Sequence, residues 1–208
     1  MKKGTLTILS GFSGAGKGTV MKAMLAKYED RYALSVSATS RKPRAGEVDG
    51  REYFFKTKEE FEELIAGEKL IEYAKYVDNY YGTPAEYVEQ QRNAGKDVLL
   101  EIEVQGALQV KEKYPEALLI FLTPPSVEEL KKRLIGRGTE EMDVIEQRLS
   151  RAKEEAVYMD RYEYIVVNDT VDACVERIHR LIQSQHDLAY YRQDLIAGMR
   201  EELNRLVG

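Results

Sequence analysis

A glycine-rich segment near the N-terminus has the composition of a phosphate-binding loop. It consists of Gly11, Phe12, Ser13, Gly14, Ala15, Gly16, Lys17, Gly18 and Thr19. It follows a short β-prone run, residues 6–9, and leads into an expected helix at residues 20–28. Glycines let the backbone curl so that successive N–H groups converge on a phosphate, and the helix N-terminus adds positive potential. Lys17 is then placed to reach the β- and γ-phosphates of a nucleoside triphosphate.

The loop departs from the strict pattern at the position that usually serves magnesium. That pattern places Ser or Thr directly after the lysine, whereas Gly18 stands there and Thr19 follows. A carboxylate at the end of a neighbouring strand would complete a metal site, and Glu101 closes an apolar run. We therefore expect Mg²⁺ as cofactor, with Thr19 and Glu101 as ligands, directly or through water. Spacing alone leaves open that Glu101 is a plain strand-end glutamate.

A second group of cations follows at residues 35–47. Arg41 and Arg44 lie three residues apart and are stiffened by Pro43, which makes a fork suited to a phosphate. Tyr53 and Tyr81 lie in the segments that follow. On the residues alone, this stretch is either a second anion site or a solvated basic loop.

Apolar runs at residues 98–102, 117–122 and 164–167 are typical of buried strands, and helical patterns lie between them. One such helix starts at Ser126, which with Glu129 makes a candidate capping box. This alternation predicts an α/β fold, with a parallel central sheet flanked by helices.

Two segments interrupt the alternation. The first is rich in tyrosine and charge, and we interpret it as a small inserted α+β subdomain; the second is highly charged and helical, and we interpret it as a lid. The single domain, residues 1–208, is thus divided into a core (1–34, 95–136 and 161–208), the subdomain (35–94) and the lid (137–160). The C-terminal tail places Leu195, Met199, Leu203 and Leu206 at helical spacing, which predicts a helix that packs on the core or on a partner subunit.

Composition excludes several classes of protein. The 208 residues carry a formal net charge of -5, which argues against a broad basic face for nucleic acid or for a membrane surface. The single cysteine, Cys174, cannot form an internal disulfide, and no stretch approaches the ~20 apolar residues that cross a bilayer. We therefore expect a cytoplasmic protein with small-molecule partners.

The stretch around the two arginines resembles the signature of the guanylate kinase family. The resemblance covers most of the chain and rests on these segments: 37–47, 50, 53–55, 71–73, 79–83, 101–106, 124–126, 133–138 and 167–169. It implies a P-loop nucleoside monophosphate kinase fold and phosphoryl transfer from ATP to GMP, and also to dGMP, within purine metabolism. The chain differs at Glu103, where aspartate is usual in the family; glutamate keeps the carboxylate and adds a methylene.

The resemblance also implies roles for individual residues. The GMP phosphate would be held by Arg41, Arg44, Tyr53 and Tyr81, and guanine would face Ser37, Glu72, Thr83 and Glu103. ATP would be bound by the loop (Ser13, Gly14, Ala15, Gly16, Lys17, Gly18 and Thr19) together with Arg133, Arg137 and Asn168. Catalysis would depend on Lys17, Arg41, Arg137 and Arg148.

The chemistry agrees with those roles. Carboxylates can accept hydrogen bonds from the ring N–H and amino group of guanine, whereas adenine would place a lone pair against a carboxylate. Thr83 has an alternative role as helix cap, because Pro84 and Glu86 follow it; Glu72 could be a solvent-facing strand residue. His179, His186 and Cys174 show no ligand or nucleophile pattern and are interpreted as structural.

Three other functions remain to be weighed. A kinase for AMP or UMP is disfavoured by the Arg41–Arg44 stretch with Glu72. A scaffold module that has lost catalysis should lack a complete phosphate loop, and a small GTPase should carry a guanine-reading Asn-Lys-x-Asp sequence. The possible oligomeric states are a monomer and a homo-oligomer such as a dimer.

Overall fold

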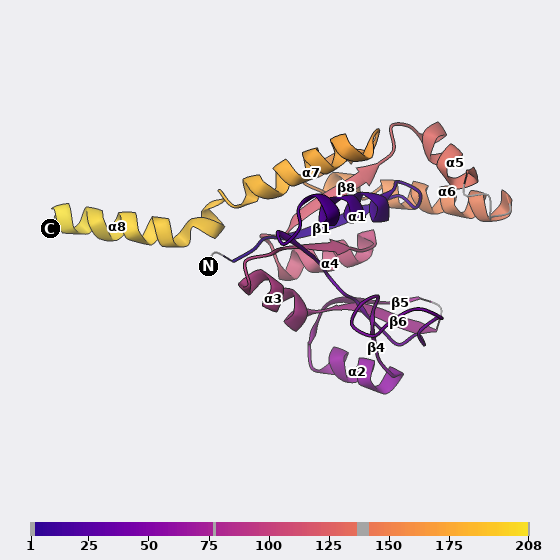
Figure 1. Cartoon of the computed structure of the whole chain (residues 1–208), viewed down its shortest axis with the longest axis horizontal. Helices are drawn as coiled ribbons and strands as arrows, with labels where there is room; N and C mark the ends of the chain where they lie inside the picture. Colours follow the sequence, from indigo (N-terminus) through magenta and orange to yellow (C-terminus); the bar gives the residue numbers. More distant parts are fainter. Residues whose placement is uncertain (1–2, 77, 137–141, 208) are drawn as a thin grey trace.

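A five-stranded parallel sheet forms the centre of the computed structural model (Figure 1). The structure describes residues 3–76, 78–136 and 142–207. The strands lie in the order β2-β7-β1-β8-β9. Their bounds are Leu6–Gly11 (β1), Tyr32–Leu34 (β2), Asp97–Glu101 (β7), Leu118–Thr123 (β8) and Tyr164–Val167 (β9). The α/β fold predicted from the alternation of apolar runs is confirmed.

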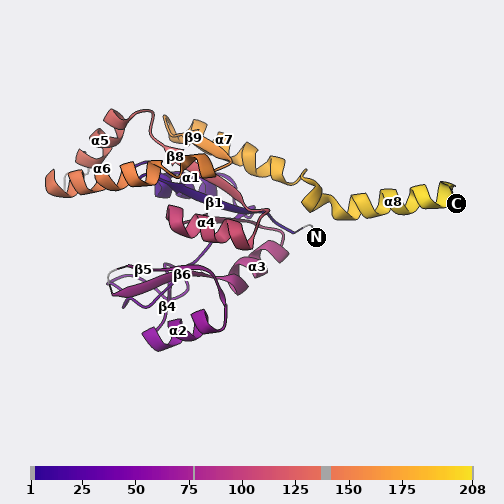
Figure 2. The ribbon, with the colours of Figure 1, turned by 180° about the vertical axis from the view of Figure 1, so that it is seen from behind.

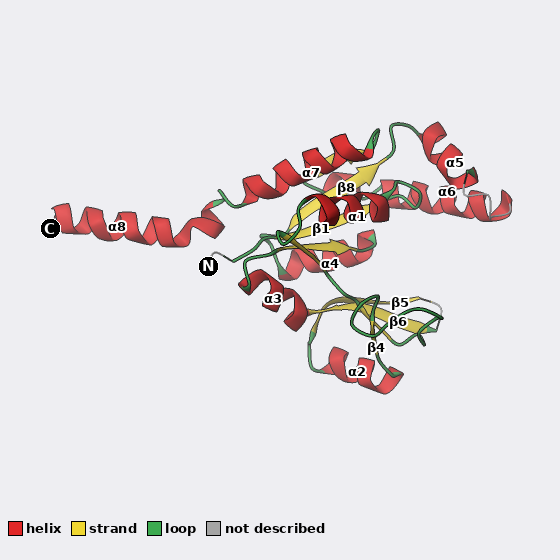
Figure 3. Ribbon diagram, viewed as in Figure 1, coloured by secondary structure: helices red, strands yellow, loops and turns green. Residues whose placement is uncertain are grey.

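Helices cover both faces of this sheet. Figure 3 shows α1 and α7 on one side of it, and α3 and α4 on the other. Their bounds are Lys17–Lys27 (α1), Ala85–Asn93 (α3), Val104–Lys113 (α4) and Val171–Gln185 (α7). The central strands are continuous apolar runs, and the helices bury them on both faces. Strands and helices share one hydrophobic core.

A second, mixed sheet of four strands lies beside the first, in the order β4-β3-β6-β5. All its strands come from the segment expected to form the subdomain; the bounds are Ala38–Thr39 (β3), Phe54–Phe55 (β4), Leu70–Tyr76 (β5) and Asn79–Pro84 (β6). Helix α2, Lys58–Ala66, packs Phe61 into its own small core with Ala38 and Leu70. It starts at a complete capping box between Thr57 and Glu60.

Helices α5, Val127–Ile135, and α6, Met142–Ala156, pack on each other. The capping box expected at the start of α5 is only half formed. The Ser126 hydroxyl accepts the N–H of Glu129 at 3.1 Å, but the Glu129 carboxylate accepts Nε of Arg133 instead. A short 3-10 turn, Met159–Arg161, links α6 to β9.

The C-terminal helix α8, Gln193–Val207, extends away from the rest of the molecule (Figure 1 and Figure 2). It follows a 3-10 turn, Ala189–Arg192, and has no buried residue. Its four spaced apolar side chains, Leu195, Met199, Leu203 and Leu206, are 55–82% exposed. Packing on the core was therefore a wrong prediction, because helical spacing reveals an apolar face but not what covers it. Packing on a partner subunit stays a prediction.

Within the described part of the chain, no helix combines the length and the apolar character needed to span a membrane.

Candidate functional site

A cleft of about 920 Å³ opens where the parallel sheet faces the second sheet. One wall is made by the carboxyl end of β7 and the start of α4, and another by β5 and β6. Helix α6 supplies a third part of the lining with Arg151, Glu154 and Glu155. Parallel α/β sheets bind ligands outside the carboxyl ends of their strands, so this cleft is the candidate site.

The glycine-rich loop turns from β1 into α1 through backbone conformations that favour glycine. Gly14 and Gly16 have φ of 93° and 92°. A Cβ on Gly16 would lie 2.6 Å from Nδ2 of Asn168. That amide, which is buried, donates to the carbonyl oxygen of Ala15 at 2.8 Å and so braces the loop. The tight turn is thus held by the residue that follows β9 as well as by its own glycines.

Lys17 folds back onto this loop. Its Nζ donates to the carbonyl oxygens of Gly11 at 2.6 Å and Phe12 at 3.3 Å. Arg148 approaches the loop from α6, with an NH1–Oγ distance of 3.4 Å to Ser13. A lysine and an arginine from two elements therefore flank the loop, which suits the phosphates of a bound nucleotide.

Glu101 lies beside the same loop, as expected from the end of its strand. A Cβ on Gly18 would lie 3.9 Å from its Oε2, so nothing bulky separates this carboxylate from the loop. Burial raises the pKa of Glu101, the charge of Lys17 opposes that rise, and Glu103 adds to it. Thr19, two residues after the lysine, is exposed.

The donor set fits Mg²⁺ held mainly by phosphates. Among the described residues, no group of three or more His, Cys, Asp and Glu side chains could hold a metal ion. A single hard carboxylate beside a phosphate loop is the arrangement that Mg²⁺ accepts when waters and phosphate oxygens complete its shell.

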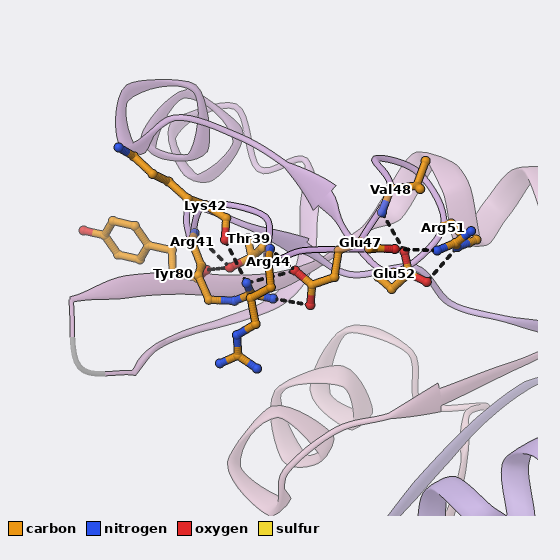
Figure 4. A network of polar contacts seen from close by, with 10 residues as sticks. Thr39, Arg41, Lys42, Arg44, Glu47, Val48, Arg51, Glu52 and Tyr80 are labelled. Atoms are coloured by element: carbon orange, nitrogen blue, oxygen red, sulfur yellow. Dashed lines mark hydrogen bonds and ion pairs between the residues drawn. The ribbon is translucent and has the colours of Figure 1, made fainter.

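On the second sheet, Arg41 is bound by a carboxylate (Figure 4). Its NH1 and NH2 donate to the two oxygens of Glu47 at 3.0 and 2.9 Å, and Glu47 also accepts the backbone N–H of Arg44 at 2.7 Å. The guanidinium lies 5.4 Å from the ring centre of Tyr53, within cation–π range. Hydrogen bonding to Glu47 raises the pKa of Arg41 and, with the Arg44 backbone, lowers that of Glu47.

The two tyrosines expected near the GMP phosphate meet here. Tyr53 and Tyr81 pack edge to face, with ring centres 6.0 Å apart, and both line the cleft. Burial raises the pKa of Tyr53. Arg44 is exposed, and Figure 4 shows its side chain pointing away from the Arg41–Glu47 pair.

Three of the four residues expected at guanine line the cleft, namely Ser37, Glu72 and Glu103. Glu72 is only 6% exposed, and burial raises its pKa. Thr83 is fully buried and donates its hydroxyl to Glu72 Oε1 at 2.7 Å. Because Pro84 occupies the N-cap position of α3, the alternative role of Thr83 as a helix cap is wrong. The other alternative, Glu72 facing solvent, is wrong as well.

The remaining expected residues are spread more widely. Arg133 is held by Glu129 at 2.9 Å and by the carbonyl oxygen of Asn168 at 3.0 Å, behind the loop. Arg137 lies outside the described residues.

His179 stacks on Tyr28, and Cys174 is buried in α7, where burial raises the pKa of its thiol to about 11. Their interpretation as structural residues agrees with these surroundings.

Sequence reasoning missed the contribution of α6 beyond Arg148. Arg151 donates to Glu103 at 3.0 Å and to Glu155 at 3.2 Å, and all three line the cleft. A signal was present, because positions 148, 151 and 155 recur at the spacing of one helix face.

Comparisons with known proteins agree on one family. The sequence model described as "Guanylate kinase" matches residues 3–185. A guanylate kinase of Bacillus anthracis is 54% identical over 202 residues, covering 95% of this chain and 98% of that protein. One of Lactococcus lactis subsp. lactis is 53% identical over 195 residues, covering 94% and 93%. The crystal structure of guanylate kinase from Anaplasma phagocytophilum superposes with a TM-score of 0.69 at 31% identity, covering 90% of this chain and 89% of that one.

Proposed function

The chain belongs to the guanylate kinase family, and from that premise we propose how its cleft carries out the reaction. The protein is an ATP-dependent kinase that converts GMP to GDP and releases ADP. In the proposal, ATP lies on the glycine-rich loop and GMP lies against the second sheet. The transferred phosphoryl group passes between them.

One observation carries the proposal. One space of about 350 Å³ is lined both by Lys17 of the glycine-rich loop and by Ser37 and Tyr53 of the subdomain segment, together with Glu101 and Glu103. Donor and acceptor phosphates entering from the two sheets would therefore meet in one place. In-line transfer requires such an alignment.

The reaction needs no catalytic base, because the acceptor is a phosphate oxygen whose second pKa is about 6. What remains is to neutralise charge on the moving phosphoryl group. Lys17 would do so by exchanging its two carbonyl acceptors for phosphate oxygens, and Arg148 already lies beside the loop. Arg137 is assigned to the ATP adenine, and Arg133, which donates to the carbonyl oxygen of Asn168, is assigned to a place behind Arg148. Glu101 and Thr19 would hold Mg²⁺ beside the phosphates, directly or through water, and the ion would supply further neutralisation of charge.

On the acceptor side, Arg41, Arg44, Tyr53 and Tyr81 are assigned to the GMP phosphate. Arg41 is already oriented, because Glu47 and the Tyr53 ring fix its guanidinium plane. Arg44 would swing in from its exposed position.

The guanine ring is assigned to a layer of carboxylates. Glu72 and Glu103 would accept from the ring N–H and the amino group, and Ser37 would donate to the carbonyl. Thr83 acts through Glu72, since its only hydroxyl proton is donated to that carboxylate. A base with the wrong donors would leave these groups unpaired, which is the basis of strong discrimination.

Closure of the second sheet and of residues 137–160 over both nucleotides would exclude water, which would otherwise accept the phosphoryl group. Fluorescence distances between α2 and α6 should shorten when both nucleotides are added. Unchanged distances would contradict closure.

The test is coupled ADP formation with ATP, Mg²⁺ and each of the four nucleoside monophosphates. GMP should be the preferred acceptor and dGMP a second substrate, because no assigned residue requires the 2′-hydroxyl.

Arg41→Ala should raise the KM for GMP about tenfold or more, through the loss of charge-assisted hydrogen bonds. Turnover of AMP exceeding that of GMP would contradict the assignment of the guanine site.

The same proposal includes the cellular location, the binding partners and the oligomeric state. A net charge of -5 argues against nucleic acid or a membrane surface as a partner, and one buried cysteine suits the cytoplasm. Sedimentation of the purified protein would distinguish a monomer from a homo-oligomer assembled through α8.

A further inference from the structure

Gly106, in the first turn of α4, is buried against the side chain of Glu72 on β5. A Cβ on Gly106 would lie 2.9 Å from Oε2 of Glu72 and 3.4 Å from its Cδ. The first distance is too short for a non-bonded contact between carbon and oxygen. The carboxylate of Glu72 therefore occupies the space that a side chain at residue 106 would fill. The helical backbone of α4 does not itself require glycine there, because other residues adopt the same conformation.

The other oxygen of this carboxylate is held from the opposite element. Thr83 on β6 donates its hydroxyl to Oε1 of Glu72 at 2.7 Å. Glu72 is 6% exposed and Thr83 is fully buried, while Glu72 and Gly106 both line the cleft. The carboxylate is thus fixed at one oxygen by a hydroxyl and has its other oxygen against a glycine.

Helix α4 and strand β5 pack on each other and are tied together farther along the helix. Nζ of Lys113 donates to the carbonyl oxygen of Leu70 at 3.1 Å, two residues before Glu72. Gly106, Val110 and Lys113 recur at the spacing of one helix face, and Val110 is fully buried. A methyl group at residue 106 would therefore displace the carboxylate of Glu72, because a side-chain end moves more easily than the packed helix and strand.

We infer that Gly106 is a positioning residue for the guanine site: it has no side chain and so leaves the space in which Thr83 orients the carboxylate of Glu72. The inference deepens the proposed function and rests on it. A displaced carboxylate would accept hydrogen bonds from guanine with poorer geometry, and such bonds weaken steeply as their geometry worsens. The phosphate loop should be unaffected, because Lys17 and Asn168 contact it without α4.

The experiment uses the full chain, with Gly106→Ala, Glu72→Asp, the double variant and Glu72→Gln, and measures kcat, both KM values and the melting temperature. Gly106→Ala should raise the KM for GMP about tenfold, the loss expected for one charged hydrogen bond. Its kcat and its KM for ATP should stay within about twofold of the unmodified protein. Gly198→Ala on α8 is the matched control, because a Cβ there meets nothing within 4 Å, and it should leave all parameters unchanged.

The double variant separates this role from a general disturbance of α4. Glu72→Asp shortens the side chain by one methylene, which should raise the KM for GMP in the unmodified background but also removes the overlap with a methyl group at residue 106. In the Gly106→Ala background it should therefore raise that KM less than about twofold further. The melting temperature of Gly106→Ala should stay within a few degrees of the unmodified protein, since alanine favours a helix more than glycine does. If it falls farther, Glu72→Asp should restore it.

The outcomes distinguish the two proposals. No GMP phosphorylation by the unmodified chain, or an unchanged KM for GMP in Glu72→Gln, would overturn the assignment of the guanine site and the inference with it. If Glu72→Gln raises that KM but Gly106→Ala does not, the inference alone is wrong. It is also wrong if the effects of Gly106→Ala and Glu72→Asp multiply in full, if the KM for ATP rises as much as that for GMP, or if Glu72→Asp fails to restore a lowered melting temperature.

Discussion

The glycine-rich loop (the loop wall) and the second sheet (the second-sheet wall) hold their cations in different ways. On the loop wall, Lys17 donates to two backbone carbonyls of its own loop, which are neutral acceptors. On the second-sheet wall, Arg41 is paired through both terminal nitrogens with Glu47, and the two side chains are only 15% and 18% exposed. The loop wall therefore offers a lysine with easily exchanged acceptors, and the second-sheet wall offers an arginine already fixed by a carboxylate.

This difference follows from what builds each wall. The loop is shaped by backbone conformation and braced by Asn168, so its phosphate-binding groups are mostly N–H groups that cannot rotate away. The second sheet offers side chains, which have rotamer freedom to lose on binding. Its charges are ordered in advance by Glu47 and by Thr83, which binds Glu72.

The largest effect should come from breaking the loop wall. Lys17→Ala should lower kcat about 10²–10³-fold, because it removes charge stabilisation of the moving phosphoryl group. The KM for GMP should change little. Steady-state kinetics would check this, with Lys22→Ala on the exposed side of α1 as the matched control. Full activity in Lys17→Ala would contradict the assigned mechanism.

An intermediate effect is expected from Glu72 on the other wall. Glu72→Gln should raise the KM for GMP about 10–100-fold, since a neutral amide oxygen accepts a hydrogen bond from guanine more weakly than the charged carboxylate does. Glu63→Gln, on the exposed side of α2, is the control.

The same substitution should stabilise the free protein at neutral pH. Burial raises the pKa of Glu72 above its unfolded value, so the folded chain binds a proton more tightly and loses stability as pH rises through that interval. Glu72→Gln removes this loss, and its melting temperature should exceed that of the unmodified protein at pH 7 but not at pH 4. A lower melting temperature at pH 7 would show that the Thr83 bond outweighs the buried charge.

The smallest effect should come from the residue that orders Arg41. Glu47→Gln should raise the KM for GMP about threefold to tenfold without lowering kcat, because Arg41 keeps its charge but loses a paired acceptor. Glu47→Asp should recover part of the loss, and Glu59→Gln is the control. In an Arg41→Ala background the Glu47 substitution should add nothing. A full additional loss there would mean that Glu47 acts independently of Arg41.

Much of this cleft was visible in the sequence, and the reasons differ by region. The loop could be predicted because glycines and a lysine at fixed spacing between strand and helix are local features. The carboxylates assigned to guanine were proposed through a family resemblance that spans most of the chain. The predicted capping box at Ser126 forms only in part, because the Glu129 carboxylate accepts a hydrogen bond from Arg133 instead of from the backbone of Ser126. Rules that consider only the capping pair do not include this contact.

The sequence by itself determined the parallel sheet, the loop and the acidic and basic residue types of each wall, since these depend on periodicity and neighbouring residues. Only the tertiary structure decided which charges meet. Glu103 and Arg151, which are 48 residues apart in the chain, pair across the cleft. Thr83 donates its hydroxyl to Glu72 instead of capping a helix, and α8 does not pack on the core. Such pairings depend on how two sheets and a helix are placed around a shared space, and chain spacing does not encode that distance.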